Sequence, residues 1–288
     1  LFTPDAERSA GNANVLFVGD MFFDRHIRKT IETVGPDFIF SCIYPLLSRA
    51  DFVVGNLEGP ITDNPSVARD TKPEDTDHFR FTFPPVIAES LRRNNITIVN
   101  LGNNHIGNFG REGLQRTKDY LDASNVAYFG GLATDEPVYR KDANGTPLSF
   151  VSYNRFGGAE AKDVADVIRL EKSVGRTVLV YAHWGEEYSS TTPSMKETAQ
   201  LFAEAGANAV IGSHPHVVLE SEYIGDTLVY YSLGNFIFDQ YWNDDVSHGR
   251  AVLLHISPDP EKKISVTEFT TIMQTDGRVC EGEPYYRN

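Results

Sequence analysis

The sequence is poor in cysteine and contains no long apolar run. Its two cysteines, Cys42 and Cys280, lie far apart in 288 residues and form no CxxC pair. We therefore expect no structural disulfide framework, and the two residues do not indicate a redox compartment. No apolar stretch approaches the ~18 residues that a membrane-spanning helix needs, so we expect a soluble chain without a transmembrane segment.

Basic residues are also few. The chain has 26 Lys and Arg against 40 Asp and Glu, which gives a net charge of −14 at pH 7. Salt-driven binding to nucleic acid requires a basic surface, so we expect no nucleic-acid partner. The hydrophobic content of 41% excludes general disorder. A chain of this length can bury a sizeable core in one large domain.

Short apolar runs alternate with segments of helical pattern along most of the chain. The runs occupy residues 15–18, 52–54, 96–99, 126–129, 148–152, 178–181, 209–211 and 228–231. Boundary prolines and glycines and the apolar spacing predict helices at residues 84–95, 110–125 and 193–206. This alternation predicts an α/β fold.

The ends of the chain differ from this pattern. Two strands joined by a polar turn, at residues 249–257 and 264–273, predict an antiparallel hairpin. A stretch rich in proline and charge at residues 62–73 predicts an exposed loop. We divide the chain into a flexible leader at residues 1–14, a single domain at 15–275 and a C-terminal tail at 276–288.

Five of the apolar runs are followed closely by side chains that can bind a metal ion. These side chains are Asp20, Glu58, Asn104, His183, and the pair His214 and His216. Each one alone is an ordinary turn or surface residue, but ligands in open α/β sheets bind beyond the carboxyl ends of the strands. The joint occurrence of all five clusters at such ends predicts a shared metal centre.

The chemistry of these side chains narrows the type of centre. Carboxylate, amide and imidazole donors without thiolate favour Mn, Fe or Zn over a closed structural zinc site. The donors are too numerous for one tetrahedral ion, so we expect two ions about 3.5–4 Å apart. Such a pair lowers the pKa of a bridging water and neutralises charge on a phosphoryl oxygen, while a free histidine can protonate the leaving group.

The motifs around these residues resemble those of the calcineurin-like metallophosphatase superfamily and, within it, the CapA (PgsA) family of capsule and poly-γ-glutamate biosynthesis. The resemblance extends over residues 19–25, 56–61, 103–105, 183–188, 212–216 and 231–240. It implies a four-layer sandwich in which two mixed β-sheets are flanked by helices. It also implies a ligand set: Asp20 and His216 for one ion, Asn104, His183 and His214 for the second, and Glu58 as the bridge.

The resemblance further implies a hydrolytic mechanism in which a metal-bound hydroxide attacks a phosphoester. His105 matches the superfamily's leaving-group acid. Four residues of the family motifs are expected to face the substrate: Arg25, Glu186, Tyr188 and Asn235.

The chain departs from the superfamily pattern at two positions. Phe22 stands where the superfamily commonly has a metal-binding histidine, so the first ion site is one ligand short and is expected to be weak or empty. Asn108 stands where an aspartate often follows the acid motif, which leaves the tautomer of His105 less well fixed.

Three functions are compatible with these features. The first is a metal-dependent phosphoesterase of envelope polymer metabolism, acting on an anionic polymer or a phosphoester. The second is a non-catalytic subunit that binds polymer or partner proteins in a membrane poly-γ-glutamate synthesis or export complex. The third is a nucleotide-directed metallophosphatase. The resemblance also implies an extracytoplasmic domain, anchored to the membrane through a segment upstream of Leu1.

Overall fold

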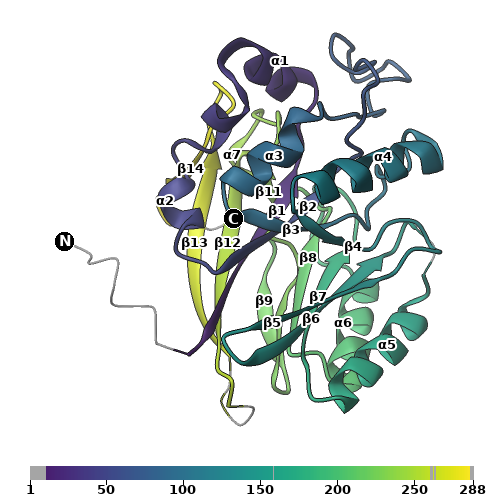
Figure 1. Ribbon diagram of the computed structural model, residues 1–288, viewed down its shortest axis with the longest axis vertical. Helices are drawn as coiled ribbons and strands as arrows, with labels where there is room; N and C mark the ends of the chain where they lie inside the picture. Colours follow the sequence, from purple (N-terminus) through teal and green to yellow (C-terminus); the bar gives the residue numbers. More distant parts are fainter. Residues whose placement is uncertain (1–10, 158, 260–261, 263, 286–288) are drawn as a thin grey trace.

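A computed structural model describes residues 11–157, 159–259, 262 and 264–285 (Figure 1). The first of its two sheets has eight strands in the order β14-β13-β12-β1-β2-β3-β4, and β11 pairs with β1 off this path. Its strands are β1 (Ala13–Met21), β2 (Phe52–Leu57), β3 (Ile96–Asn100), β4 (Ala127–Phe129), β11 (Asn235–Ile237), β12 (His248–Ile256), β13 (Ser265–Met273) and β14 (Val279–Gly282).

The second sheet has six strands in the order β5-β6-β7-β8-β10-β9. They are β5 (Val138–Ala143), β6 (Thr146–Asn154), β7 (Thr177–His183), β8 (Ala209–Ser213), β9 (Ser221–Ile224) and β10 (Thr227–Tyr230). In each sheet a parallel centre continues into antiparallel strands, as at β1 and β12 and at β5 and β6.

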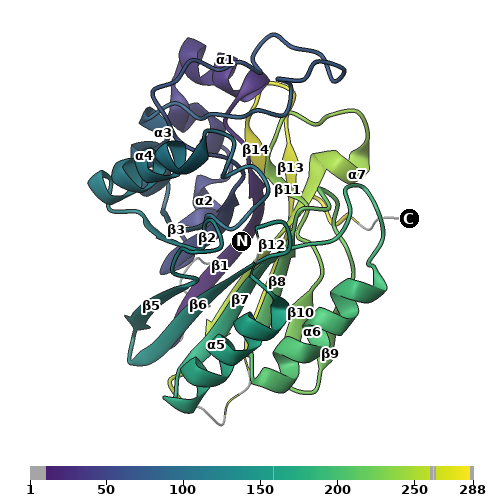
Figure 2. The ribbon, with the colours of Figure 1, turned by 90° about the vertical axis from the view of Figure 1, so that its right-hand side faces the viewer.

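Helices cover the outer face of each sheet. Those against the first sheet are α1 (Arg25–Val34), η1 (Pro36–Phe40), α2 (Tyr44–Leu47), α3 (Val86–Arg93) and α4 (Gly110–Ala123). Helices α5 (Ala161–Ser173) and α6 (Pro193–Ala205) lie side by side on the second sheet, and the short α7 (Asp244–Ser247) precedes β12 (Figures 1 and 2). The predicted fold, two mixed sheets flanked by helices, is confirmed.

The alternation of side chains along β1 explains the layers. Leu16 and Val18 point to the core beneath the helices, whereas Val15 and Phe17 point to the core between the two sheets. Period-two alternation with both faces apolar is what a strand buried on both sides requires. The hydroxyl of Tyr181 in β7 donates a hydrogen bond to the carbonyl oxygen of Val18 at 2.6 Å, which joins the two sheets near their carboxyl ends.

Most predicted elements are present with small shifts at their ends. All eight apolar runs are in strands, the three predicted helices are α3, α4 and α6, and the hairpin is β12 with β13. The sequence pattern did not predict the remaining elements, which are α1, η1, α2, α5, α7, β5, β9, β11 and β14. Strand β5 lies at a sheet edge and is buried only at its two end residues, so it lacks the continuous apolar run that marked the central strands.

Both ends of the domain extend beyond the predicted boundaries. Ala13 and Asn14 of the predicted leader belong to β1 and are buried, and residues 1–10 lie outside the described part. The predicted tail contains β14, which pairs with β13. The predicted loop at 62–73 has no helix or strand, but Thr62 and Ala68 within it are buried.

The expectation of no structural disulfide is wrong. Cys42 and Cys280 form a disulfide across a sequence separation of 238 residues. Cys42 lies between η1 and α2, and Cys280 lies in β14, so the bond ties the outer helical layer to the last strand of the first sheet. As for the membrane, the described residues include no helix with both the length and the apolar character needed to span one.

Removing this disulfide should destabilise the fold. Replacing both cysteines by serine frees a long loop in the unfolded chain, and we expect the free energy of unfolding to fall by about 2–5 kcal/mol. Urea denaturation of the double variant beside the oxidised wild type measures this difference. Thiol titration of the unreduced, unfolded wild type should find no free thiol, and two free thiols would contradict the assignment.

Candidate metal centre

The candidate metal ligands lie where the parallel strands of both sheets end. Asp20 is near the end of β1, Glu58 directly follows β2, His183 ends β7, and His214 directly follows β8. Neighbouring parallel strands bring their carboxyl ends to one edge of a sheet, and the packing of the two sheets brings the two edges together. Residues from four distant parts of the sequence therefore reach one place.

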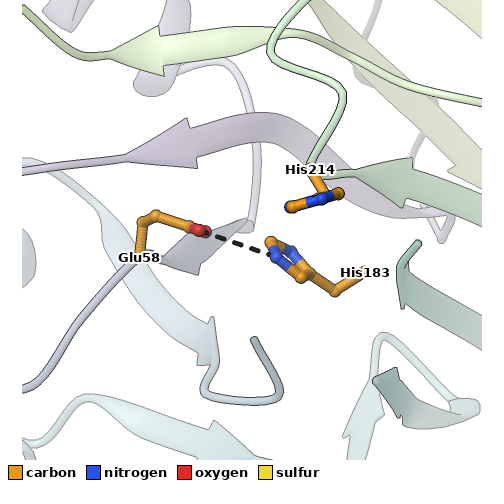
Figure 3. A group of neighbouring side chains, drawn as sticks. All are labelled: Glu58, His183 and His214. Carbon is orange, nitrogen blue, oxygen red and sulfur yellow. Dashed lines mark ion pairs between the residues drawn. The ribbon is translucent and has the colours of Figure 1, made fainter. Parts of the chain in front are cut away.

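Glu58, His183 and His214 form the most compact group. One ligand atom from each lies within 4.8 Å of the others, and all three side chains are buried. Glu58 Oε1 is 3.6 Å from His183 Nε2, and the ring centroids of His183 and His214 are 4.8 Å apart. Figure 3 shows the Glu58 carboxylate pointing toward His183, with the His214 ring beside both. The predicted convergence of these three residues is present.

The remaining predicted ligands adjoin this group. Asn104 Oδ1 is 2.9 Å from His183 Nε2, and Asp20 Oδ2 is 3.4 Å from His216 Nδ1. With metal–ligand bonds of about 2.1 Å, two ligand atoms of one ion lie about 3.0–3.4 Å apart. The separation of Asn104 and His183 is close to this range. His216 Nδ1 faces both Asp20 and Asn235, so Nε2 is the nitrogen of His216 that is left to bind an ion.

Two ligand atoms of the centre lack the hydrogen-bond partners that buried polar atoms usually have. Glu58 Oε1 and His214 Nδ1 are both buried, and neither has a hydrogen-bond partner among the described residues. Leaving a buried polar atom without a partner costs about 1–3 kcal/mol, more when it is charged. A bound cation can satisfy a carboxylate oxygen and an imidazole nitrogen, so the residues present fit a metal ion.

A buried amide holds the two carboxylates of the centre. Asn56 Nδ2 donates to Asp20 Oδ1 at 2.8 Å and also contacts Glu58 Oε2. Its Oδ1 accepts hydrogen bonds from Asn100 and Asn103 at 3.0 and 3.1 Å. Asn56 and Glu58 are two residues apart on extended chain, which puts both on the same side. The amide therefore fixes the spacing of Asp20 and Glu58.

Hydrogen bonds also orient the imidazole rings. Ser213 Oγ lies 3.0 Å from His183 Nδ1, and Asn235 Oδ1 lies 2.9 Å from His216 Nδ1. Partners of this kind fix the ring orientation of metal-binding histidines. Asn235, which was expected to face substrate, is buried and also donates to the side chain of Gln240 at 2.9 Å. Its observed contacts are those of a residue that positions His216.

The backbone of the turn that carries His214 and His216 is unusual. Their φ angles are 94° and 58°, in the left-handed region that side-chain-bearing residues rarely adopt. A Cβ on Gly212, just before this turn, would meet the carbonyl oxygen of Tyr231 at 2.0 Å, so only glycine fits there. Strained backbone of this kind is concentrated at functional sites.

Burial and neighbouring charges set the protonation of the centre. Burial and then the charge of Asp20 raise the pKa of Glu58 well above its usual value. Burial acts to raise the pKa of Asp20 as well, but its hydrogen bond to His216 and the charge of that ring bring it to about 2. The two carboxyl groups thus differ widely in acidity, although Asn56 touches both.

The two imidazoles nearest Glu58 are held neutral. Burial, followed by the charge of His214, lowers the pKa of His183 well below its usual value. Burial and the charge of His216 lower the pKa of His214 to about 4, and nearby Arg155 adds to this effect. Neutral imidazole is the form that ligates a metal, so both rings are ready to bind at neutral pH.

His105 lies on the same loop as Asn104 and packs against Phe81 at a ring-centroid distance of 4.3 Å. The side chain of Asn103 accepts hydrogen bonds from the backbone N–H groups of His105 and Ile106, which fixes the turn. Asn108 Nδ2 is 3.3 Å from His105 Nδ1 and donates to the carbonyl oxygen of Phe79 at 2.8 Å. Asn108, at the sequence position where an aspartate was expected, therefore contacts the His105 ring.

Phe22, the residue in place of a histidine ligand, is fully buried in an aromatic cluster. Its ring stacks on Phe238 at 4.5 Å and meets Phe81 edge-on at 4.7 Å. Arg25 lies over the ring of Phe22 at 4.6 Å and is paired with Asp239, so its guanidinium is engaged within the protein. The cluster fills the space on this side of the centre with apolar side chains.

Tyr188 and Glu186, the other two residues expected to face substrate, are both exposed. The ring of Tyr188 is 6.0 Å from that of His216. The sequence reading missed Glu187, whose carboxylate forms a second group with His214 and His216, all within 4.8 Å of one another. Glu187 lies in the same sequence motif as Glu186 and Tyr188, so the sequence did indicate this segment. The sequence does not show which of the two adjacent glutamates faces the histidines, because that depends on the conformation of the loop.

Comparison with known families agrees with this geometry. The family model described as bacterial capsule synthesis protein PGA_cap matches residues 14–240, which include every strand end that carries a ligand. The chain belongs to this family. The resemblance to CapA proteins, inferred from the motifs, is confirmed.

Two curated relatives carry the CapA name. The chain is 30% identical over 247 residues to the PGA biosynthesis protein CapA of Bacillus subtilis (strain 168), with 78% of this chain and 63% of the relative covered. It is 26% identical over 263 residues to the capsule biosynthesis protein CapA of Bacillus anthracis, with 83% of this chain and 63% of the relative covered. The match thus spans less than two thirds of each relative.

The metal centre makes a direct prediction about His183. We expect His183→Ala to weaken Mn²⁺ binding at least tenfold, because the variant loses the imidazole that lies next to Glu58 and Asn104. His26→Ala, which removes an exposed histidine outside the centre, should bind like wild type. Isothermal titration calorimetry measures both.

A thermal unfolding series provides an independent readout. Mn²⁺ at 100 times its dissociation constant should stabilise wild type by about 2.7 kcal/mol. If the His183→Ala variant is stabilised equally at the same Mn²⁺ concentration, the assignment of this group as a metal site is contradicted.

Proposed function

We propose that this chain is a metal-dependent phosphoester hydrolase of capsule or poly-γ-glutamate biosynthesis. The observation that carries the proposal is a pair of adjoining ligand groups that share His214, one with Glu58 and His183 and the other with Glu187 and His216. A pair of ions in such an arrangement suits in-line displacement at phosphorus. Membership of the capsule synthesis family supports the biological setting.

The role of the ligands follows from their charge and position. Divalent ions bound there, of which Mn, Fe and Zn suit the donors, would supply an activated water molecule and positive charge beside the phosphoryl oxygens. Glu58, which lies close to Asp20 and His183, would hold ions of both sites. Asn56 keeps the two carboxylates at a constant spacing during turnover, because it contacts both.

His105 is the residue that assists the leaving group. Burial, followed by the charges of His216 and His214, lowers the pKa of His105 to about 3, so the ring is neutral at physiological pH. A neutral imidazole still carries one N–H, which can donate to the oxygen of the departing group. The contacts with Phe81 and Asn108 hold the ring in one orientation for this role.

A second candidate is a non-catalytic subunit that binds an anionic polymer or a partner protein. The observation in its favour is the burial of Phe22, which supplies no ligand to the first ion site. The net charge of −14 opposes the approach of a polyanion, but bound cations and the exposed Arg155 near His214 offset this charge locally. Such a subunit would bind poly-γ-glutamate without turning over phosphoesters.

The disulfide supports a location outside the cytoplasm. Disulfides persist in oxidising compartments and are rare in the cytosol, and the Cys42–Cys280 bond joins distant parts of the fold. We infer that the domain works on the outer side of the cell membrane, held there through an anchor in a longer protein. Subunits of a membrane polymer-synthesis complex are the expected partners.

Hydrolysis of model substrates tests the enzymatic proposal. With Mn²⁺ present, wild type should hydrolyse an aryl phosphate monoester or diester. His105→Ala should lower kcat by about 10²–10⁴ while Mn²⁺ affinity stays unchanged, because the ring acts on the leaving group and not on the ions. The loss should be larger for alkyl leaving groups, because their oxygen carries more negative charge as it departs and gains more from a hydrogen bond donated by the His105 N–H.

The substrates tested should also include nucleotides. Their turnover distinguishes a nucleotide-directed enzyme from one that acts on other phosphoesters. Turnover that is unaffected by His105→Ala would remove this residue from the mechanism. No turnover of any phosphoester, combined with retained binding of poly-γ-glutamate, would favour the non-catalytic candidate.

A further inference from the structure

The ion site next to His216 lacks a ligand on the side of Phe22. This phenylalanine is packed among Phe81 and Phe238, and the ring of Phe238 also lies 4.9 Å from that of His216. No polar donor reaches the site from this aromatic cluster. Unless another residue supplies a ligand, the site depends on Asp20 and the two histidines of the turn.

Glu187 lies close to both of these histidines. Its carboxylate oxygen and one nitrogen each from His214 and His216 are within 4.8 Å of one another. The two imidazoles are buried, and Glu187 is exposed, so the carboxylate closes the group from the solvent side. Two imidazoles and one carboxylate form a donor set that suits Mn, Fe or Zn.

The loop that carries Glu187 is fixed to the histidine turn at two points. The backbone N–H of Trp184 donates to the carbonyl oxygen of Ser213 at 3.2 Å, and that of Tyr188 donates to the carbonyl oxygen of Pro215 at 2.8 Å. These bonds lie on either side of Glu187. Its position relative to His214 and His216 is therefore set by backbone contacts, not by the carboxylate itself.

Close packing at Gly185 adds to this constraint. Gly185 has a φ of 88°, and a Cβ there would lie 2.9 Å from Met195 Sδ and 3.3 Å from Pro215 Cγ. The positive φ favours glycine at residue 185, and Met195 and Pro215 leave little room for a side chain there. Gly185 thus helps to bring Glu187 to the site.

A buried atom without a hydrogen-bond partner belongs to this group as well as to the group of Glu58 and His183. His214 is only 4% exposed, and its Nδ1 has no hydrogen-bond partner among the described residues. Buried imidazole nitrogens normally have a partner, and a cation is one that would also bring Glu187 and His216 together. An exposed acidic residue alone would not require a ligand, but this buried atom does.

We propose that Glu187 is a ligand of the first metal ion and replaces the donor that Phe22 does not provide. This inference rests on the proposed two-ion centre. It predicts that the first site is occupied, with His216, Asp20 and Glu187 around the ion and His214 between the two groups. The site is then complete without a histidine at position 22.

The metal stoichiometry of the Glu187→Gln variant tests this role, with Glu186→Gln as the matched control. Each substitution removes one negative charge from an exposed position of the same loop. Mn²⁺ titration calorimetry, elemental analysis after gel filtration and electron paramagnetic resonance provide three readouts that do not depend on activity. Wild type and Glu186→Gln should bind two Mn²⁺ and show the spectrum of a coupled pair.

Glu187→Gln should retain the site formed by Glu58 and His183 and bind the other ion at least tenfold more weakly. Its spectrum should change to that of a single Mn²⁺. Because Glu187 is exposed, the thermal midpoint of the metal-free variant should equal that of wild type. Two ions bound with unchanged affinity in Glu187→Gln would overturn the inference while leaving the two-ion centre intact. A wild type that binds no Mn²⁺ would overturn both.

Discussion

The carboxylate of Glu58 lies fully buried beside the imidazole of His183, with a second carboxylate, Asp20, close by. Moving a charged carboxylate out of water is costly unless it is paired, and two such groups in one place repel each other. The surrounding hydrogen bonds offset this cost only in part. Asn56 is one amide shared by two carboxylates, and Glu58 Oε1 has no hydrogen-bond partner within the described part of the chain. A cation is the partner that suits this arrangement.

The rest of the fold holds these groups together. The candidate ligands lie at or shortly after the carboxyl ends of strands, and the strands are fixed by cores on both of their faces. The contact from Tyr181 to Val18 joins the two sheets close to the site, so the ligands of one sheet cannot move freely relative to those of the other. The Cys42–Cys280 disulfide ties the outer helical layer to β14, the last strand of the first sheet.

The main features of the site could be predicted because they depend on local sequence. Apolar runs followed directly by Asp20, Glu58 or His183 identify both a strand and the residue at its carboxyl end. The prediction failed for residues whose position depends on tertiary contacts. Glu187 reaches the centre only because Tyr188 and Trp184 are bonded to the histidine turn. Cys42 and Cys280 meet only because β14 pairs with β13 at the far end of the chain.

The roles of the two asparagines at 103 and 104 illustrate the same limit. As a sequence, the pair is an ordinary turn. In the structure Asn103 bonds the backbone of the turn, whereas Asn104 points its oxygen at His183. Only the side-chain directions separate a turn-forming residue from a ligand.

Anomalous X-ray diffraction from crystals grown with Mn²⁺ locates each bound ion without reference to activity. We expect two anomalous peaks about 3.5–4 Å apart, with Glu58 between them and His183 in contact with one of them. Crystals of fully folded protein in excess Mn²⁺ without a peak among Glu58, His183 and His214 would contradict it.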